Sequence, residues 1–180
     1  MIRQPIVTIA GHVDHGKTSI LDSIRKTFVA EKEVGGITQK ISFTSFPADK
    51  ILERCKLLKP ENLEIPGFLF IDTPGHEAFT NLRKRGGSLA DLAILVIDIN
   101  EGIMPQTAEV LQILRLNKTP FIIALNKIDA ISGWKKQENL KKSIENQAIH
   151  TKQEFEQKLY TIIGALNSYN FNADLYYNID

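Results

Sequence analysis

Four short runs of apolar residues divide the chain, and each run is continuous rather than alternating with polar residues. They lie at 6–10, 68–71, 92–97 and 121–125. A continuous apolar run of this length is typical of a strand that is buried on both faces of a parallel sheet. The four runs therefore predict the inner strands of a single sheet.

Three further segments carry apolar residues at helical spacing. The three stripes are Ile20, Leu21, Ile24 and Phe28; then Val110, Leu111 and Leu114; and then Phe155, Leu159, Ile162 and Leu166. Pro105 precedes the second stripe and suits the first turn of a helix. Strands that alternate with helices predict an α/β fold, with a mostly parallel sheet, helices on both of its faces and right-handed crossovers.

Two segments interrupt this alternation. Residues 30–66 contain the pair Gly35-Gly36 and three prolines, which predicts a loop, one edge strand near 41–46 and a surface excursion over 48–66. Residues 130–150 are polar and basic, so we interpret them as an insertion rather than a core element. No repeat, low-complexity tract or linker is visible, and we expect a single domain over 1–180.

Composition and net charge argue against several classes of protein. The 180 residues are 43% hydrophobic, which is enough for one core, and 22 basic against 21 acidic residues leave a net charge of +1. This balance argues against a general DNA-binding protein or a membrane-surface protein. The lone Cys55 excludes an intramolecular disulfide and a cysteine-based metal site. No run is long enough for a signal peptide or a membrane span, so we expect a cytoplasmic protein.

The segment GHVDHGKT at 11–18 fits the pattern G-x-x-x-x-G-K-[ST] and lies between the first predicted strand and the first predicted helix. Glycines in such a loop let backbone N–H groups surround phosphate oxygens. We expect Lys17 to reach the β- and γ-phosphates and Thr18 to bind Mg²⁺. The alternative is a glycine turn that binds nothing. The remaining predicted phosphate-binding residues are Gly11, His12, Val13, Asp14, His15, Gly16 and Ser19.

The second candidate motif is DTPG, at the end of the second apolar run. A carboxylate at the carboxyl end of a strand beside a phosphate loop holds the Mg²⁺ shell, and we expect Asp72 to do so through water. Gly75 can bring its N–H against a γ-phosphate and change conformation when that phosphate leaves. Without the phosphate loop, the same residues would predict only a turn.

The third candidate motif is NKID, after the fourth apolar run. Asp129 could accept hydrogen bonds from the N1–H and the exocyclic amine of guanine, a pair of donors that adenine lacks. Lys127 would lie along the plane of the base, and Asn126 would tie this loop to the phosphate loop. The alternative is a polar turn after a strand.

Together these motifs resemble the GTPase superfamily. GHVDHGKT, DTPGH and INEGIMPQT are similar to translational GTPases, and GGITQ at 35–39 with the run from DTPGHEAF to ADLAILVIDINEG resembles the initiation factor 5B family, relatives of bacterial initiation factor 2. The resemblance covers essentially the whole chain. It implies a P-loop GTPase fold with switch I over 30–45 and switch II over 72–90.

The resemblance also implies roles for five loop residues. His76 would position the attacking water after the RNA of the large ribosomal subunit draws it into place. Thr38 would complete the Mg²⁺ shell, although it could be a solvated loop residue. Asp14 would bind a monovalent cation (K⁺ or Na⁺), or could serve as a turn carboxylate. Val13, together with Ile37, would form an apolar gate beside His76, and ordinary packing explains these two equally well.

The implied function is a GTP-binding and GTP-hydrolysing switch that promotes the joining of ribosomal subunits. The family's Ser-Ala-Lys motif is not found after Asp129, and no later run predicts a sixth strand. We therefore expect a domain truncated before its last strand and helix, with initiator tRNA reached only through domains absent here.

Two alternatives remain open. One is a non-hydrolysing fragment that binds nucleotide or ribosome, and the other is a tRNA-delivering elongation factor.

Overall fold

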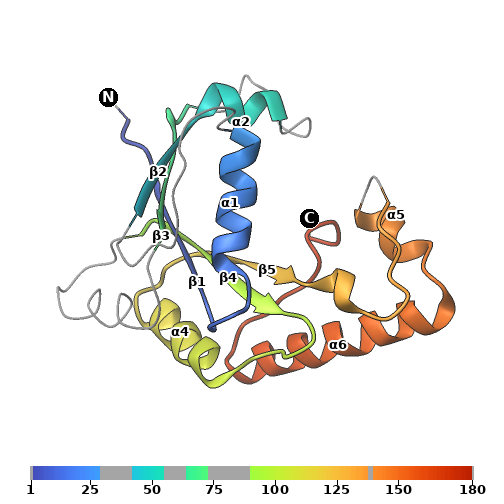
Figure 1. The fold of residues 1–180 in the computed structure, drawn as a ribbon. Coiled ribbons are helices and arrows are strands. Elements are labelled where there is room, and N and C mark those ends of the chain that lie inside the picture. Colours follow the sequence, from blue (N-terminus) through green and yellow to red (C-terminus); the bar gives the residue numbers. More distant parts are fainter. Residues whose placement is uncertain (1, 29–41, 55–63, 73–89, 138–139, 180) are drawn as a thin grey trace.

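The computed structural model describes residues 2–28, 42–54, 64–72, 90–137 and 140–179 (Figure 1). One five-stranded sheet forms its centre, with the spatial order β2-β3-β1-β4-β5. The strands are β1 (Ile6–Gly11), β2 (Ser42–Pro47), β3 (Gly67–Asp72), β4 (Leu92–Asp98) and β5 (Phe121–Asn126). The helices are α1 (Lys17–Phe28), α2 (Ala48–Arg54), α4 (Pro105–Leu116), α5 (Leu140–Glu145) and α6 (Ile149–Ser168), and a short 3₁₀ turn covers Ile128–Ala130.

The strand pairing confirms the predicted α/β fold. β1 pairs in parallel with both β3 and β4, and β4 pairs in parallel with β5. The predicted edge strand is β2, which pairs antiparallel with β3. Since the four parallel strands point the same way, their carboxyl ends and the residues that follow them gather at one edge of the sheet. The three candidate motifs all follow strands that end at this edge.

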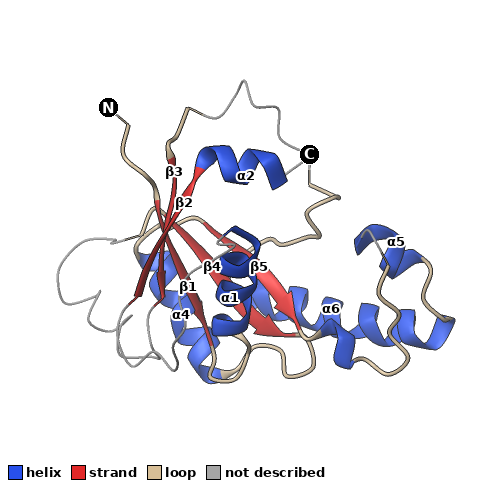
Figure 2. Ribbon diagram, turned by 45° about the horizontal axis from the view of Figure 1, so that its top comes forward, coloured by secondary structure: helices blue, strands red, loops and turns tan. Residues whose placement is uncertain are grey.

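Helices cover both faces of the sheet, as the alternation predicted (Figure 2). On one face, Leu21 of α1 and Ile51 of α2 pack with buried residues of β1, β2, β3 and β4. On the other face, the stripes of α4 and α6 pack on Leu95 and Ile97 of β4. The residues of the α6 stripe, predicted from spacing alone, are all buried: Phe155, Leu159, Ile162 and Leu166. No helix within the described ranges is both long enough and apolar enough to cross a membrane.

Residues 130–150 differ from the expectation of an insertion outside the core. Ile131 and Ile144 are buried in the same cluster as α4 and α6, with exposed fractions of 2% and 7%. Trp134 packs on Phe155, with 5.5 Å between ring centroids. The apolar residues of this segment are few and widely spaced, so its sequence gives no sign of a buried face. In three dimensions they converge on α6, and the segment therefore extends the core.

The outer edge of β5 carries no sixth strand among the described residues. Residues 169–179 form turns and irregular backbone, with Phe171 set edge-on against Phe121 of β5 at 4.9 Å. Ile122 points to the α1 side of the sheet and is 57% exposed. An apolar residue on an unpaired edge strand favours association with other chains.

We therefore expect Ile122→Lys to reduce self-association of the chain at high concentration, because a charge on an edge strand opposes strand pairing. Static light scattering would measure the change, and the melting temperature should move little for an exposed site. Ile149→Lys is the control, because Ile149 is an exposed apolar residue of α6, 79% exposed, that lies away from the sheet edge. Equal scattering by the Ile122 and Ile149 variants would show that the edge is not responsible.

Candidate nucleotide-binding site

The predicted phosphate loop connects β1 to α1 and is built around unusual backbone angles. Gly11 has φ +146° and Gly16 has φ +90°, and Asp14 adopts a left-handed conformation with φ 63°. A side chain at Gly11 would overlap with the carbonyl oxygen of Val96 in β4. Glycine is therefore required at Gly11 both by its backbone angle and by the neighbouring strand.

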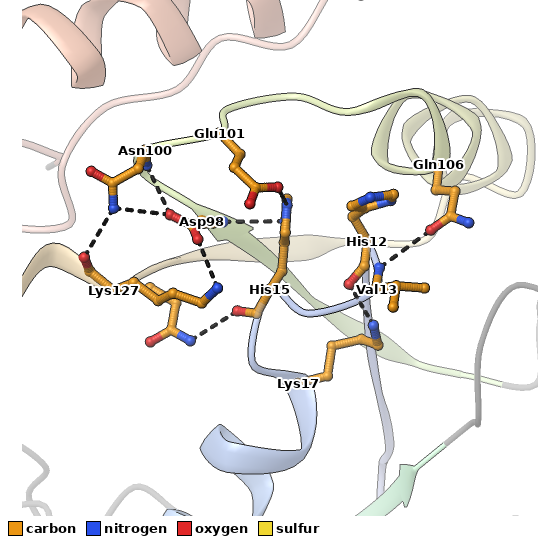
Figure 3. Close-up of polar contacts among 10 residues, drawn as sticks. His12, Val13, His15, Lys17, Asp98, Asn100, Glu101, Gln106 and Lys127 are labelled. Carbon is orange, nitrogen blue, oxygen red and sulfur yellow. Dashed lines mark hydrogen bonds and ion pairs between the residues drawn. The ribbon is translucent and has the colours of Figure 1, made fainter. Parts of the chain in front are cut away.

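Lys17, the first residue of α1, bends back over the loop. Its Nζ donates a hydrogen bond of 2.6 Å to the carbonyl oxygen of His12 (Figure 3). Thr18 and Ser19 are exposed in the first turn of the same helix, where backbone N–H groups are unsatisfied within the helix. The loop thus places a cation, two hydroxyls and a helix N-terminus together, which suits an anion.

Val13, at the outer rim of the loop, is 51% exposed, and its backbone N–H donates to Oε1 of Gln106 in α4 at 3.3 Å. Asp14 is exposed beside it. Both lie on the open side of the loop. Ile37, the predicted partner of Val13 in the apolar gate, and His76, beside which the gate was predicted, lie outside the described residues.

The base loop begins at Asn126, the last residue of β5. Its Nδ2 donates a hydrogen bond of 2.8 Å to the carbonyl oxygen of His15, so the NKID motif and the phosphate loop are joined directly. A side chain at Gly16 would overlap with this Asn126 amide. The structure thereby brings together Asn126 and the phosphate loop, as the sequence predicted. Lys127 and Asp129 follow, with Asp129 exposed in the 3₁₀ turn.

Sequence reasoning missed Asp98, the last residue of β4. Its side chain is 5% exposed, and its Oδ2 forms an ion pair of 2.9 Å with Nζ of Lys127. Burial would raise the pKa of this carboxyl, but hydrogen bonds from Lys127 and Asn100 bring the pKa below its ordinary value. The same ion pair raises the pKa of Lys127. Both groups are therefore charged at neutral pH.

His15 anchors the phosphate loop through its side chain, which is fully buried. Its Nδ1 accepts a hydrogen bond from the backbone N–H of Asp98 at 3.2 Å, so the proton of a neutral ring is on Nε2. Nε2 lies 3.2 Å from Oε2 of Glu101 (Figure 3). The sequence predicted only the backbone of His15 as part of the site. The signals for its side chain were Asp98 at the end of β4 and Glu101 shortly after it.

Two of the three residues predicted to bind Mg²⁺, Asp72 and Thr18, lie in the described part of the chain. Asp72 ends β3 and pairs in register with Ile9, two residues before the phosphate loop starts at Gly11. Thr18 lies in the first turn of α1 on the far side of that loop. In the described ranges, no three His, Cys, Asp or Glu residues could hold a metal by themselves. Hydroxyl and carboxylate oxygens, completed by nucleotide phosphates, are the ligands that Mg²⁺ prefers.

Several predicted residues fall outside the described ranges. They are Ile37, Thr38, Gly75 and His76, together with most of the two predicted switch segments, and also Cys55. Their roles stay predictions from the sequence.

Comparison with protein families gives one match over almost the whole chain. Residues 3–176 match the model described as the elongation factor Tu GTP binding domain. Among curated proteins, the probable translation initiation factor IF-2 of Methanopyrus kandleri is 55% identical over 178 residues. The corresponding protein of Thermococcus onnurineus is 56% identical over 179 residues. Each alignment covers 96% of this chain and 30% of the relative, so the chain spans about a third of its relatives' length.

Solved structures agree with this result. The chain is similar to GDP-bound aIF5B from Aeropyrum pernix, with a TM-score of 0.82 and 51% identity over 100% of this chain and 31% of that one. It is more distantly similar to a bacterial selenocysteine-specific elongation factor, with a TM-score of 0.59 and 26% identity over 96% of this chain and 25% of the other. These findings confirm the P-loop GTPase fold and the resemblance to initiation factor 5B. The chain belongs to the family of GTP-binding domains that the elongation factor Tu domain defines.

Proposed function

We propose that this chain binds GTP and GDP with Mg²⁺ and hydrolyses GTP as the switch domain of a translation initiation factor. The observation that carries the proposal is the hydrogen bond from Asn126 to the carbonyl oxygen of His15. It fixes the distance between a loop suited to phosphates and a loop suited to guanine. A guanine nucleotide has the two corresponding parts, its phosphates and its base, joined by a ribose.

Phosphate binding would use groups that already face the loop. The Lys17 ammonium now donates to a backbone carbonyl, and a phosphate oxygen offers a charged acceptor in place of that carbonyl. Backbone N–H groups from Asp14 to Thr18 would supply further donors. Thr18 and Asp72 would hold Mg²⁺, which neutralises charge that develops on the phosphates.

Hydrolysis would depend on His76 and the two switch segments. His76 would orient the attacking water, with electrostatic stabilisation rather than strong-base chemistry as its contribution. Thr38 and Gly75 would sense the γ-phosphate, so that its loss releases both switches. A monovalent cation at Asp14 would add to the charge compensation.

The ribosome is the partner we propose for the GTP-bound state. The support is the similarity to proteins named translation initiation factors and to aIF5B. Contact between His76 and the RNA of the large subunit would accelerate hydrolysis, and subunit joining would be the step that this hydrolysis completes.

Gly16→Ala tests the junction of the two loops. A Cβ at φ +90° is strained and would displace the Asn126 amide, so we expect GDP affinity to fall by at least about tenfold. Fluorescence titration with a labelled GDP would measure it. Gly164→Ala is the control, since nothing lies within 4 Å of a Cβ there, and this change in α6 should leave affinity unaltered. Undiminished affinity in the Gly16 variant would mean that nucleotide binds elsewhere.

Asp129→Asn tests whether Asp129 recognises the guanine base. The amide would face the exocyclic amine of guanine with its own NH₂ but could pair with the additional carbonyl of xanthine. We expect weaker GTP binding and a preference for xanthosine triphosphate in a competition titration. A variant that keeps its preference for guanine would show that this loop does not contact the base.

His76→Ala separates binding from chemistry in a chain extended to the full length of its relatives. GTP affinity should stay nearly unchanged, while hydrolysis stimulated by ribosomes should fall by at least about a hundredfold. Phosphate release with and without ribosomes would measure both rates. Unaltered stimulated turnover would remove His76 from the mechanism, and the absence of any hydrolysis in the unchanged protein would favour a non-hydrolysing binding module.

A further inference from the structure

Asp98 lies between the two loops of the site without belonging to either motif. It ends β4, the strand between β1 and β5, and hydrogen bonds connect it to residues that follow both neighbours (Figure 3). We infer that Asp98 is a positioning residue for guanine recognition: its carboxylate holds the Lys127 side chain in place beside the base. The inference rests on the proposed function, because it assumes that the base loop binds guanine.

The carboxylate is bound on both of its oxygens. Oδ2 accepts from Nζ of Lys127 at 2.9 Å, while Oδ1 accepts from the backbone N–H and the side-chain amide of Asn100 at 2.8 and 3.1 Å. Because Asn100 fixes the carboxylate independently, the ammonium of Lys127 meets an acceptor whose position is already set. This arrangement determines where the end of a long, flexible side chain lies.

The backbone of Lys127 is held by the same group of residues. Nδ2 of Asn100 donates to the carbonyl oxygen of Lys127 at 3.2 Å, and Nζ of Lys158 in α6 donates to Oδ1 of Asn100 at 2.7 Å. Lys127 itself has a left-handed backbone with φ 57°, which a non-glycine residue adopts only where its surroundings impose it. Both ends of the Lys127 side chain are therefore constrained.

Stability alone gives a poor account of this ion pair. Asp98 is the last residue of a buried apolar strand, and transfer of a carboxylate out of water costs free energy that an ion pair often fails to recover. The partner is only partly covered, with 39% of the Lys127 side chain exposed. Lys127 therefore has its charged end paired with Asp98 while its side chain is still accessible to a ligand.

The expected benefit is preorganisation. A lysine side chain loses considerable rotamer freedom when it is immobilised, and an interaction that immobilises it beforehand lowers the cost of binding. Without the Asp98 charge, the ammonium would be free to turn toward Glu101, Asp14 or water, since the first two already contribute to its electrostatic environment. Asp129, and not Lys127, would still read the exocyclic amine of the base.

The test is Asp98→Asn, which keeps the shape and the acceptor for Asn100 but removes the charge that binds Lys127. We expect the affinity for a fluorescent GDP to fall about three- to tenfold, mainly through faster dissociation. The same change in a Lys127→Met background should cause no further loss. Preference for GDP over inosine diphosphate should not change. Glu156→Gln, which removes an exposed carboxylate on α6, is the charge-matched control and should bind like the unchanged chain.

The possible results distinguish failure of this inference from failure of the proposed function. Undiminished affinity in Asp98→Asn, or an equal loss with and without Lys127, would overturn the inference and leave the proposed function standing. Failure of the unchanged chain to bind GDP would overturn the proposed function and the inference with it. If Asp98→Asn does not fold, as judged by its melting curve, Asn100→Ala replaces it. Asn100→Ala removes the hydrogen bonds that fix the Asp98 carboxylate, so it should weaken GDP binding in the chain that keeps Lys127 but not in the Lys127→Met background. GDP affinity equal to that of the unchanged chain would contradict the inference.

Discussion

One hydrogen bond sets the geometry of the site: the Asn126 amide donates to the carbonyl oxygen of His15 across 111 residues of sequence. It requires that β5 end level with the phosphate loop, and the in-register parallel pairing of β1, β4 and β5 provides this. It also requires that Gly16 have no side chain. The order of strands in the sheet and the glycine pattern of the phosphate loop therefore together determine the distance between the phosphate loop and the base loop.

The end of β4 supports both loops from the middle of the sheet. The backbone N–H of Asp98 holds the His15 ring, and its carboxylate holds Lys127. The buried His15 ring and the buried Asp98 carboxylate are thus each hydrogen-bonded, one to each side of the end of β4, so movement of one loop would disturb the other. In a protein that alternates between GTP and GDP, such a rigid base would leave conformational change to the segments that contact the γ-phosphate.

The sequence predicted the inner strands, the edge strand and three helices, because buried parallel strands and amphipathic helices have distinct periodicities. It also predicted candidate site residues at the carboxyl ends of β1, β3 and β5, but none at the end of β4. Asp98 was missed because its partner Lys127 is distant in sequence and because none of the three candidate nucleotide-binding motifs includes it. Ile131 and Ile144 were missed because their convergence on α6 has no local period. Periodicity reports what one element buries, whereas these contacts depend on how separate elements meet.

We propose that this edge of the sheet is a guanine nucleotide site. Calorimetric titration of the unchanged chain with GDP and then with ADP tests it directly, because the two ligands share their phosphates and ribose and differ only in the base. We expect GDP to bind with a dissociation constant at least about a hundredfold lower than that of ADP, since adenine would leave the Asp129 carboxylate unpaired. Equal affinity for the two nucleotides, or no binding of either, would contradict it.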